Sequence, residues 1–204
     1  LVETGGGAAA KLSPPFVPFG LGDPLGLPMP GYRFRVVDED GDEVRVGAVG
    51  QLLLRGPGVL EGYWNDSAAT EAVLDAGGWL STGDLVRRGP MGTFSFQGRA
   101  KVVIKSGGFS VYPPEVERVF EQHPDVVEAG VVGLPDDTLG EVPVVGLRMA
   151  KGAASTPDEL LSWVGERLST YKVPRRVYFV DDLPRTGTNK LQRDELIERL
   201  LDLD

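Results

Sequence analysis

Two apolar runs in the C-terminal half of the chain constrain its fold more than any other feature. Val126 to Val132 and Val142 to Met149 are rich in valine, and each has the length of a strand rather than of a helix. Ahead of them, Val116, Val119 and Phe120 follow two prolines at the i, i+3, i+4 spacing of a helix face. This alternation of helix and strand predicts a compact α+β domain.

The whole segment 98–204 can be divided into elements in this way. Gly107-Gly108 predicts a turn between two short strands, and Thr156 opens a Thr-Pro-Asp-Glu capping sequence. The expected elements are strands at 101–105 and 109–112, a helix from 113, strands at 126–132 and 142–149, a helix from 157, a strand at 177–180 and a helix at 194–201. The order is therefore ββαββαβα over about a hundred residues, an ordinary domain size.

Residues 1–97 have a different, mostly β, character. A glycine-alanine patch and six prolines in the first 30 residues predict loop. The expected elements are strands at 32–37, 44–46 and 50–56, a tight turn at Asp40-Gly41, and a helix at 67–75 capped by Asp66 or Ser67. We therefore expect a β-rich, barrel-like subdomain at 1–97, followed by a small α+β domain at 98–204.

The composition argues against several classes of function. A net charge of −9 without any Lys/Arg cluster disfavours nucleic acid as a partner. The absence of cysteine removes disulfides, thiol nucleophiles and zinc-thiolate sites, and it fits a cytoplasmic location. No apolar run approaches the length of a transmembrane segment. The single histidine, His123, has no nucleophile or carboxylate placed to work with it, so we expect a solvated residue.

Lys190 is the strongest candidate for chemistry. It ends the loop Leu183-Pro-Arg-Thr-Gly-Thr-Asn-Lys190, which leads into a helix. A proline fixes the approach to this loop, and Gly187 and Asn189 tolerate backbone angles that other residues avoid. Such a loop can carry one positive charge into the cleft of another domain.

Four further motifs accompany this loop, and the order of all five resembles that of the AMP-forming acyl-CoA synthetases and adenylation domains. They are Leu1 to Thr4, the pair Gly50–Gly56 with Gly62–Trp64, Trp79 to Leu85, and Gly98 to Glu117. The last is the most specific, because residue types and spacing agree over about twenty positions. The Gly50–Gly56 and Gly62–Trp64 pair is expected to serve packing alone.

The resemblance implies a role for five residues at the nucleotide. Lys190 would bridge the substrate carboxylate and the α-phosphate of ATP, and Asp84 would hold the ribose hydroxyls, because a carboxylate can accept from both at once. Arg99 would contact the ribose or the phosphates. Thr4 would meet the α-phosphate, and Glu3 would lie on the side of Mg²⁺, a hard cation that prefers oxygen ligands.

The resemblance also implies a moving domain and a second substrate. Lys101 would be the hinge about which the C-terminal domain turns. Gly107, Gly108 and Phe109 would line the channel for the pantetheine arm of coenzyme A, where a glycine leaves room for the thiol. A carboxylic acid and ATP would first give an acyl-adenylate and pyrophosphate, and coenzyme A would then displace AMP. Acetylation of Lys190 would remove its charge and stop the first step.

Three residues depart from the pattern of the family. Val2 stands where a threonine is usual, which removes a hydroxyl donor to phosphate. Asn189 replaces a glycine before the lysine, a change expected to be harmless because Asn tolerates left-handed angles. Val102 follows the hinge lysine where an acidic or polar residue is common, with no consequence that we can assign.

The phosphate loop and the acid pocket of the family are expected upstream of Leu1, in an N-terminal domain that would be the main partner of this chain. The 204 residues alone are therefore expected not to form an adenylate. The hairpin sequence around Gly107-Gly108 most resembles bacterial fatty- and malonyl-type CoA ligases, which favours a fatty or other hydrophobic acid. Two alternatives stay open: an adenylation domain that loads a carrier protein, and a truncated, non-catalytic binding module.

Overall fold

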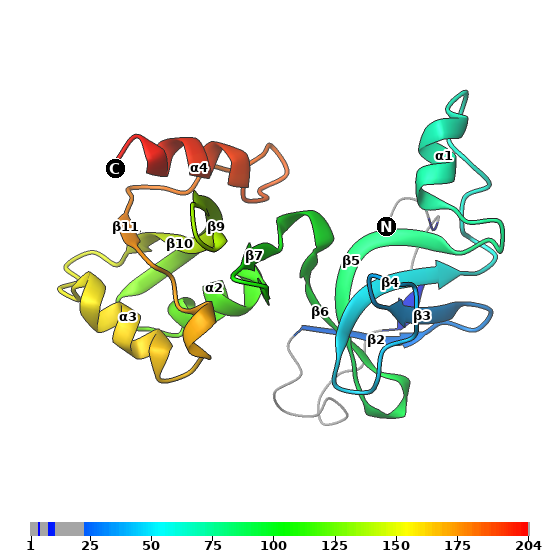
Figure 1. Cartoon of the computed structure of the whole chain (residues 1–204), viewed down its shortest axis with the longest axis horizontal. Helices are drawn as coiled ribbons and strands as arrows, with labels where there is room; N and C mark the ends of the chain where they lie inside the picture. The colour runs from blue at the N-terminus through cyan, green and yellow to red at the C-terminus, as the bar shows by residue number, and fades with distance from the viewer. Residues whose placement is uncertain (1–3, 5–7, 11–22, 204) are drawn as a thin grey trace. The chain divides into compact units, whose positions relative to one another are not determined.

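The chain is built around two separate β-sheets in the computed structural model, which describes residues 4, 8–10 and 23–203 (Figure 1). Two compact units divide between Lys101 and Val102, close to the predicted change of character near Gly98. Each unit contains its own sheet and its own buried side chains, with one core cluster in the first unit and two in the second.

The first unit contains a six-stranded antiparallel sheet in the order β1-β2-β6-β5-β4-β3. Its elements are β1 (Ala9–Ala10), β2 (Asp23–Pro28), β3 (Arg33–Val37), β4 (Val49–Arg55), α1 (Ser67–Val73), β5 (Leu80–Arg88), the short 3₁₀ helix η2 (Pro90–Gly92) and β6 (Phe94–Arg99). The β-rich character predicted for this part of the chain is confirmed, and the described sheet is open at β1 and β3.

Alternating side chains of this sheet form the first core. Along β4, Leu52 and Leu54 are buried while their neighbours are more exposed, and Leu80 and Val86 of β5 pack into the same cluster. The helix α1 begins at the predicted residue. Asp66 caps it, because its side chain accepts a hydrogen bond from the amide of Ala69, three residues later, at 2.8 Å.

The prediction of loop throughout residues 1–30 was wrong, because β2 forms there and pairs with β6. A bulge lies between Pro24 and Gly26, and the other neighbour of β2 is only two residues long. Proline lacks an amide donor and is therefore confined to irregular or sparsely paired strand positions, and β2 offers both. The pairing partner is distant in sequence, so the local proline pattern could not indicate it.

Two further local predictions for the first unit were wrong. The strand expected at 44–46 does not form: the amide of Val44 donates to the carbonyl of Val36 at 2.9 Å, but the chain turns immediately afterwards, with Ala48 bonded back to Arg45. Trp64 was expected to pack, yet it is 91% exposed among the described residues.

The second unit follows the predicted order ββαββαβα, which confirms the α+β class. Its elements are β7 (Ile104–Ser106), β8 (Phe109–Val111), α2 (Pro113–Glu121), β9 (Val126–Asp136), β10 (Gly140–Met149), α3 (Pro157–Gly165), the 3₁₀ helix η4 (Thr170–Lys172), β11 (Val177–Phe179) and α4 (Arg193–Leu201). The strand expected at 101–105 starts late, because residues 100–102 form the 3₁₀ helix η3 (Ala100–Val102).

Both faces of this second sheet are covered. Val131 and Val145 point to a core with Phe120 of α2 and Leu160 of α3, while the next residues along the strands point to a core beneath α4. Figure 1 shows α4 on one side of the strands and α2 and α3 on the other. β10 pairs antiparallel with β9 over ten residues and parallel with β11. The sheet and its helices hold the connecting segments on which the candidate site residues of this unit lie.

Candidate active site

Asp84 and Arg99 lie directly opposite each other on β5 and β6. Arg99 Nε donates to Asp84 Oδ1 at 2.9 Å, and Arg99 Nη1 donates to the carbonyl of Thr82 at 3.0 Å. The side chain of Asp84 is 16% exposed and that of Arg99 is 49% exposed. The structure therefore brings these two predicted residues together, with the arginine at the more open side.

The irregular stretch of β5 before Asp84, where the register with β4 shifts, is held in place by Thr82. Its buried hydroxyl donates to the carbonyl of Leu52 at 2.8 Å and accepts from the amide of Asp84 at 3.0 Å. Between them, Gly83 has a φ of +69°, a conformation that side chains with a Cβ rarely adopt. The Thr-Gly-Asp sequence thus sets the local backbone conformation, which directs the carboxylate of Asp84 toward Arg99.

Thr4 lies buried in the same unit, next to the loop that follows β4. Its carbonyl accepts a hydrogen bond from the hydroxyl of Tyr32 at 3.3 Å. A Cβ added at Gly58 would meet the same carbonyl at 2.5 Å, so this loop tolerates only glycine there. Glu3 and Val2 lie outside the described residues.

Lys190 lies in the second unit with an exposed side chain on a closely bonded loop. The carbonyl of Lys190 accepts from the amide of Thr186 at 2.8 Å, and the amide of Lys190 donates to the hydroxyl of Thr186 at 3.1 Å. Asn189 has a φ of +63°, as its type allows. The predicted loop thus exists, and it presents the lysine from a backbone that is fixed on both sides.

Gly107 and Gly108 form the predicted turn between β7 and β8. Both have positive φ, and the amide of Gly107 donates to the carbonyl of Leu139 at 2.9 Å. Space is open around Gly108, where an added Cβ would meet no atom within 4 Å. The next residue, Phe109, is 55% exposed, and its ring stacks on that of Tyr171 with centroids 4.7 Å apart.

Tyr171 and its neighbour Lys172 were missed by the sequence reasoning. Lys172 Nζ donates to both oxygens of Glu115, at 2.7 and 2.8 Å, and this ties η4 to the start of α2 beside the hairpin. Some sixty residues separate the partners, so no local pattern could have indicated the contact.

The exposed Lys101 lies in η3 at the end of the first unit.

A partly buried ion pair joins α2 and α4 near the Lys190 loop. Arg193, the first residue of α4, donates to Glu117 of α2, which also accepts from the amide of Val131 at 3.0 Å. Burial raises the pKa of the Glu117 carboxyl above its usual value, against the opposing effect of Arg193. Arg193 Nε is buried without a hydrogen-bond partner in the described part of the chain.

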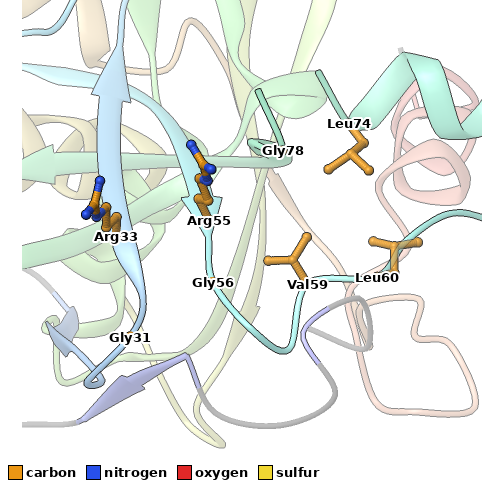
Figure 2. A pocket seen from close by; sticks show the side chains of 8 residues that line it. All are labelled: Gly31, Arg33, Arg55, Gly56, Val59, Leu60, Leu74 and Gly78. Atoms are coloured by element: carbon orange, nitrogen blue, oxygen red, sulfur yellow. The ribbon is translucent and has the colours of Figure 1, made fainter. Parts of the chain in front are cut away.

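The first unit also has a hollow of about 460 Å³. None of the predicted site residues lines it. Figure 2 shows Arg33 and Arg55 on adjacent strands, facing the same space as Val59 and Leu74. The two arginines are direct partners in the register of β3 and β4. Neither has an ion-pair partner among the described residues.

The described residues contain no group of three or more acidic, histidine or cysteine side chains able to hold a metal ion. Glu3, the predicted Mg²⁺ contact, lies outside the described residues. Among the described helices, none is both long and apolar enough to cross a membrane.

Comparison with known proteins identifies the family of this chain. The sequence model of the family "AMP-binding enzyme" matches residues 3–64, and that of the "AMP-binding enzyme C-terminal domain" matches residues 115–190, where the match ends at Lys190. The chain belongs to the AMP-binding enzyme family. The first match includes Thr4 and β4, and the second runs from α2 through the Lys190 loop.

Individual members of this family resemble the chain over most of its length. An indoleacetate–CoA ligase of Aromatoleum aromaticum is 39% identical over 84% of the chain and 33% of its own length. A long-chain-fatty-acid–CoA ligase of Yersinia pestis is 42% identical over 84% of the chain and 30% of its own length. The o-succinylbenzoate CoA synthetase of Bacillus subtilis, solved with its acyl-adenylate intermediate, has a TM-score of 0.86 at 36% identity, covering 96% of the chain and 39% of that protein.

The chain therefore spans about a third of the length of the curated AMP-binding enzymes it matches. These relatives act on different acids, as their names state. Membership in the family consequently defines the kind of chemistry expected of the whole enzyme, and it leaves the acid open.

Proposed function

We propose that this chain is the C-terminal portion of an AMP-forming acyl-CoA ligase. The observation that carries this proposal is the Lys190 loop, which presents one exposed cation from a backbone bonded on both sides of the lysine. Such a preorganised charge suits the stabilisation of negative charge that develops during adenylation. Three similar proteins named as CoA ligases or synthetases support the same reading.

In this proposal the first unit contributes to the nucleotide site. Asp84 would accept hydrogen bonds from the ribose hydroxyls, because a carboxylate can accept from both at once. Arg99, half exposed, would reach the ribose or the phosphates, and Thr4 would lie near the α-phosphate. Mg²⁺, held beside Glu3, would offset phosphate charge.

The second unit would act in both half-reactions. Lys190 would serve adenylation, and the hairpin of Gly107 and Gly108, with the exposed ring of Phe109, would line the path of the pantetheine arm of coenzyme A. The open space around Gly108 supports this assignment. One cleft could serve both steps if the second unit turned about Lys101, next to the boundary between the units.

The acid is proposed to be hydrophobic, with a fatty acid as the leading candidate. A long-chain-fatty-acid–CoA ligase is among the similar proteins, beside ligases for aromatic acids. Selectivity would reside in the upstream part of the enzyme, so the 204 residues alone should release no pyrophosphate from ATP. Pyrophosphate release by this chain alone would contradict that part of the proposal.

The test uses the full-length protein in wild-type and Lys190→Ala forms. ATP–pyrophosphate exchange is measured against a panel of fatty and aromatic acids, and thioester formation is then followed from supplied acyl-adenylate and coenzyme A. Lys190→Ala should lose exchange and keep thioester formation, and the panel should identify the acid. A wild-type enzyme that forms adenylate but ignores coenzyme A would instead support the loading of a carrier protein.

A second pair of variants tests the hinge. Lys101→Pro should fix the backbone at this position and impair one half-reaction more than the other, whereas Lys101→Ala should leave both nearly intact. Equal loss of both half-reactions in Lys101→Pro, with normal unfolding, would count against rotation about this residue.

A further inference from the structure

The peptide bond that leads into Lys190 is held at both of its polar atoms by side chains. Its carbonyl, that of Asn189, accepts a hydrogen bond from Arg185 Nη1 at 2.8 Å. Its amide, that of Lys190, donates to the hydroxyl of Thr186 at 3.1 Å. The plane of a peptide is rigid, so fixing both atoms fixes the N–Cα bond of Lys190; because the carbonyl of Lys190 is also held, by the amide of Thr186 at 2.8 Å, the direction in which the side chain leaves the loop is restricted as well.

Arg185 is itself braced from the sheet. Its second terminal nitrogen, Nη2, donates to Glu128 Oε1 on β9 at 2.7 Å, and the other oxygen of Glu128 accepts from Arg148 Nε on β10 at 2.9 Å. Hydrogen bonds from Arg148 and then from Arg185 lower the pKa of the Glu128 carboxyl, so this brace remains ionised at neutral pH. The chain of contacts runs from the paired strands to the tip of the loop.

The shape of a guanidinium is what this arrangement requires. Its fork carries several donors in one plane, so one side chain can bind a carboxylate on the sheet and a carbonyl on the loop at the same time. A lysine at position 185 has a single nitrogen on a flexible stem and could not hold both acceptors in fixed directions.

We propose that Arg185 is a positioning residue for Lys190, which it orients through the carbonyl of Asn189 while Glu128 holds it against β9. The effect of Arg185 on catalysis rests on the proposed function. Its effect on the orientation of Lys190 does not, because that orientation is a property of the second unit. Arg185 contributes to the adenylation half-reaction, in which Lys190 acts, and contributes nothing to thioester formation.

The kinetic test uses the full-length enzyme with Arg185→Lys, Arg185→Ala and Glu128→Gln. Misplacing a catalytic group by about an ångström can cost on the order of 100-fold in rate, so both Arg185 variants should lower kcat for ATP–pyrophosphate exchange by roughly 10- to 100-fold. The KM values and the rate of thioester formation from supplied acyl-adenylate should stay within about twofold. Glu128→Gln should show a smaller loss in exchange alone.

The matched control is Arg199→Ala. Arg199 lies on α4 of the same unit and, like Arg185, forms an ion pair, here with Glu195 and Asp182, but it makes no hydrogen bond to the loop among the described contacts. Its removal should leave both half-reactions unchanged. Equal losses in the two half-reactions for the Arg185 variants, or no loss in either, would overturn the positioning role.

A second measurement separates this inference from the proposed function. Amide hydrogen exchange in the 204-residue chain should be about tenfold faster at Lys190 in Arg185→Lys than in wild type. The amide of Gln192, bonded to the carbonyl of Pro184 at 2.9 Å, should change little and serves as the internal control. Unchanged exchange at Lys190 refutes the brace, whereas faster exchange with no kinetic effect of Lys190→Ala refutes only the proposed function.

Discussion

Asn189 has a left-handed backbone, with φ at +63°, directly before the proposed catalytic lysine. Asn189→Gly should therefore leave the loop intact, while Asn189→Val should cost about 1–2 kcal/mol, because a left-handed residue with a branched Cβ clashes with its own carbonyl. Urea unfolding followed by the fluorescence of Trp163, in the same unit, measures both changes. Equal stability of the glycine and valine variants would show that the loop relaxes out of this conformation.

Asp125 provides a pH-dependent contact within the second unit. It accepts from the hydroxyl of Ser155 at 2.6 Å and from the amides of Ala154 and Ser155, and these bonds, the hydroxyl first, lower its pKa below the usual 3.8. A lowered carboxyl pKa adds stability above the unfolded value and loses it as the pH falls through the folded value. The stabilising contribution should thus be complete near pH 6, should begin to fall as the pH approaches the unfolded value of 3.8, and should be gone only below the lowered pKa of the folded state.

This sign can be checked by comparing urea midpoints of wild type, Asp125→Asn and Ser155→Ala between pH 6 and pH 3. The advantage of wild type over either variant should shrink as the pH falls, since other depressed carboxylates, such as Asp136, titrate equally in all three proteins. An advantage that grows toward low pH would contradict the assignment.

At the scale of elements, the pairing of β3 with β4 contains an unfavourable contact. Arg33 and Arg55 are direct partners in this register and line the same hollow (Figure 2). Like charges placed opposite each other destabilise a sheet, and an opposite-charge pair contributes roughly 0.2–1 kcal/mol. Arg33→Glu should therefore stabilise the first unit relative to Arg33→Gln by about that amount, and added salt should reduce the difference.

Unfolding by heat or urea is followed by the fluorescence of Trp79, in the first unit, at low and at high salt. The comparison separates the effect of charge on stability from the effect of side-chain shape. Equal stability of Arg33→Glu and Arg33→Gln at low salt would show that Arg33 and Arg55 do not repel each other appreciably.

Elements whose signals are local could be predicted from the sequence. The capping box of α3 is formed by Thr156 and Glu159 as its spacing indicates, and β9 and β10 coincide with the two apolar runs. The misses depend on distant partners. β2 exists because β6 is available beside it, and the strand expected at 44–46 is lost because pairing with β3 stops there.

The same distinction applies to the candidate site. The loop of Lys190 and the turn of Gly107-Gly108 are visible in the sequence, because proline, glycine and asparagine mark their backbone angles. The support for these features was not visible: Tyr171 beneath Phe109, and Arg185 braced by Glu128, join segments about sixty residues apart. A single sequence carries no record of such pairs.

At the scale of the whole molecule, the two units have separate cores: the first unit contains one core, and the second contains one on each face of its sheet. The second unit has about a hundred residues, an ordinary size for a domain that folds alone. A domain that rotates during catalysis must keep its own packing while its contacts with the rest of the enzyme change. Separate cores satisfy that condition, because no buried side chain has to leave its neighbours.

Separate cores also make a prediction about stability. Phe120→Ala, at a fully buried position of α2, should cost about 3–5 kcal/mol in the second unit, and Leu54→Ala should cost about 2–5 kcal/mol in the first. Unfolding of the 204-residue chain, resolved with Trp163 for the second unit and Trp79 for the first, should show each variant shifting one transition alone. If Phe120→Ala shifted both transitions together, the two units would unfold as one body, and rotation about Lys101 would have to break that coupling in every catalytic cycle.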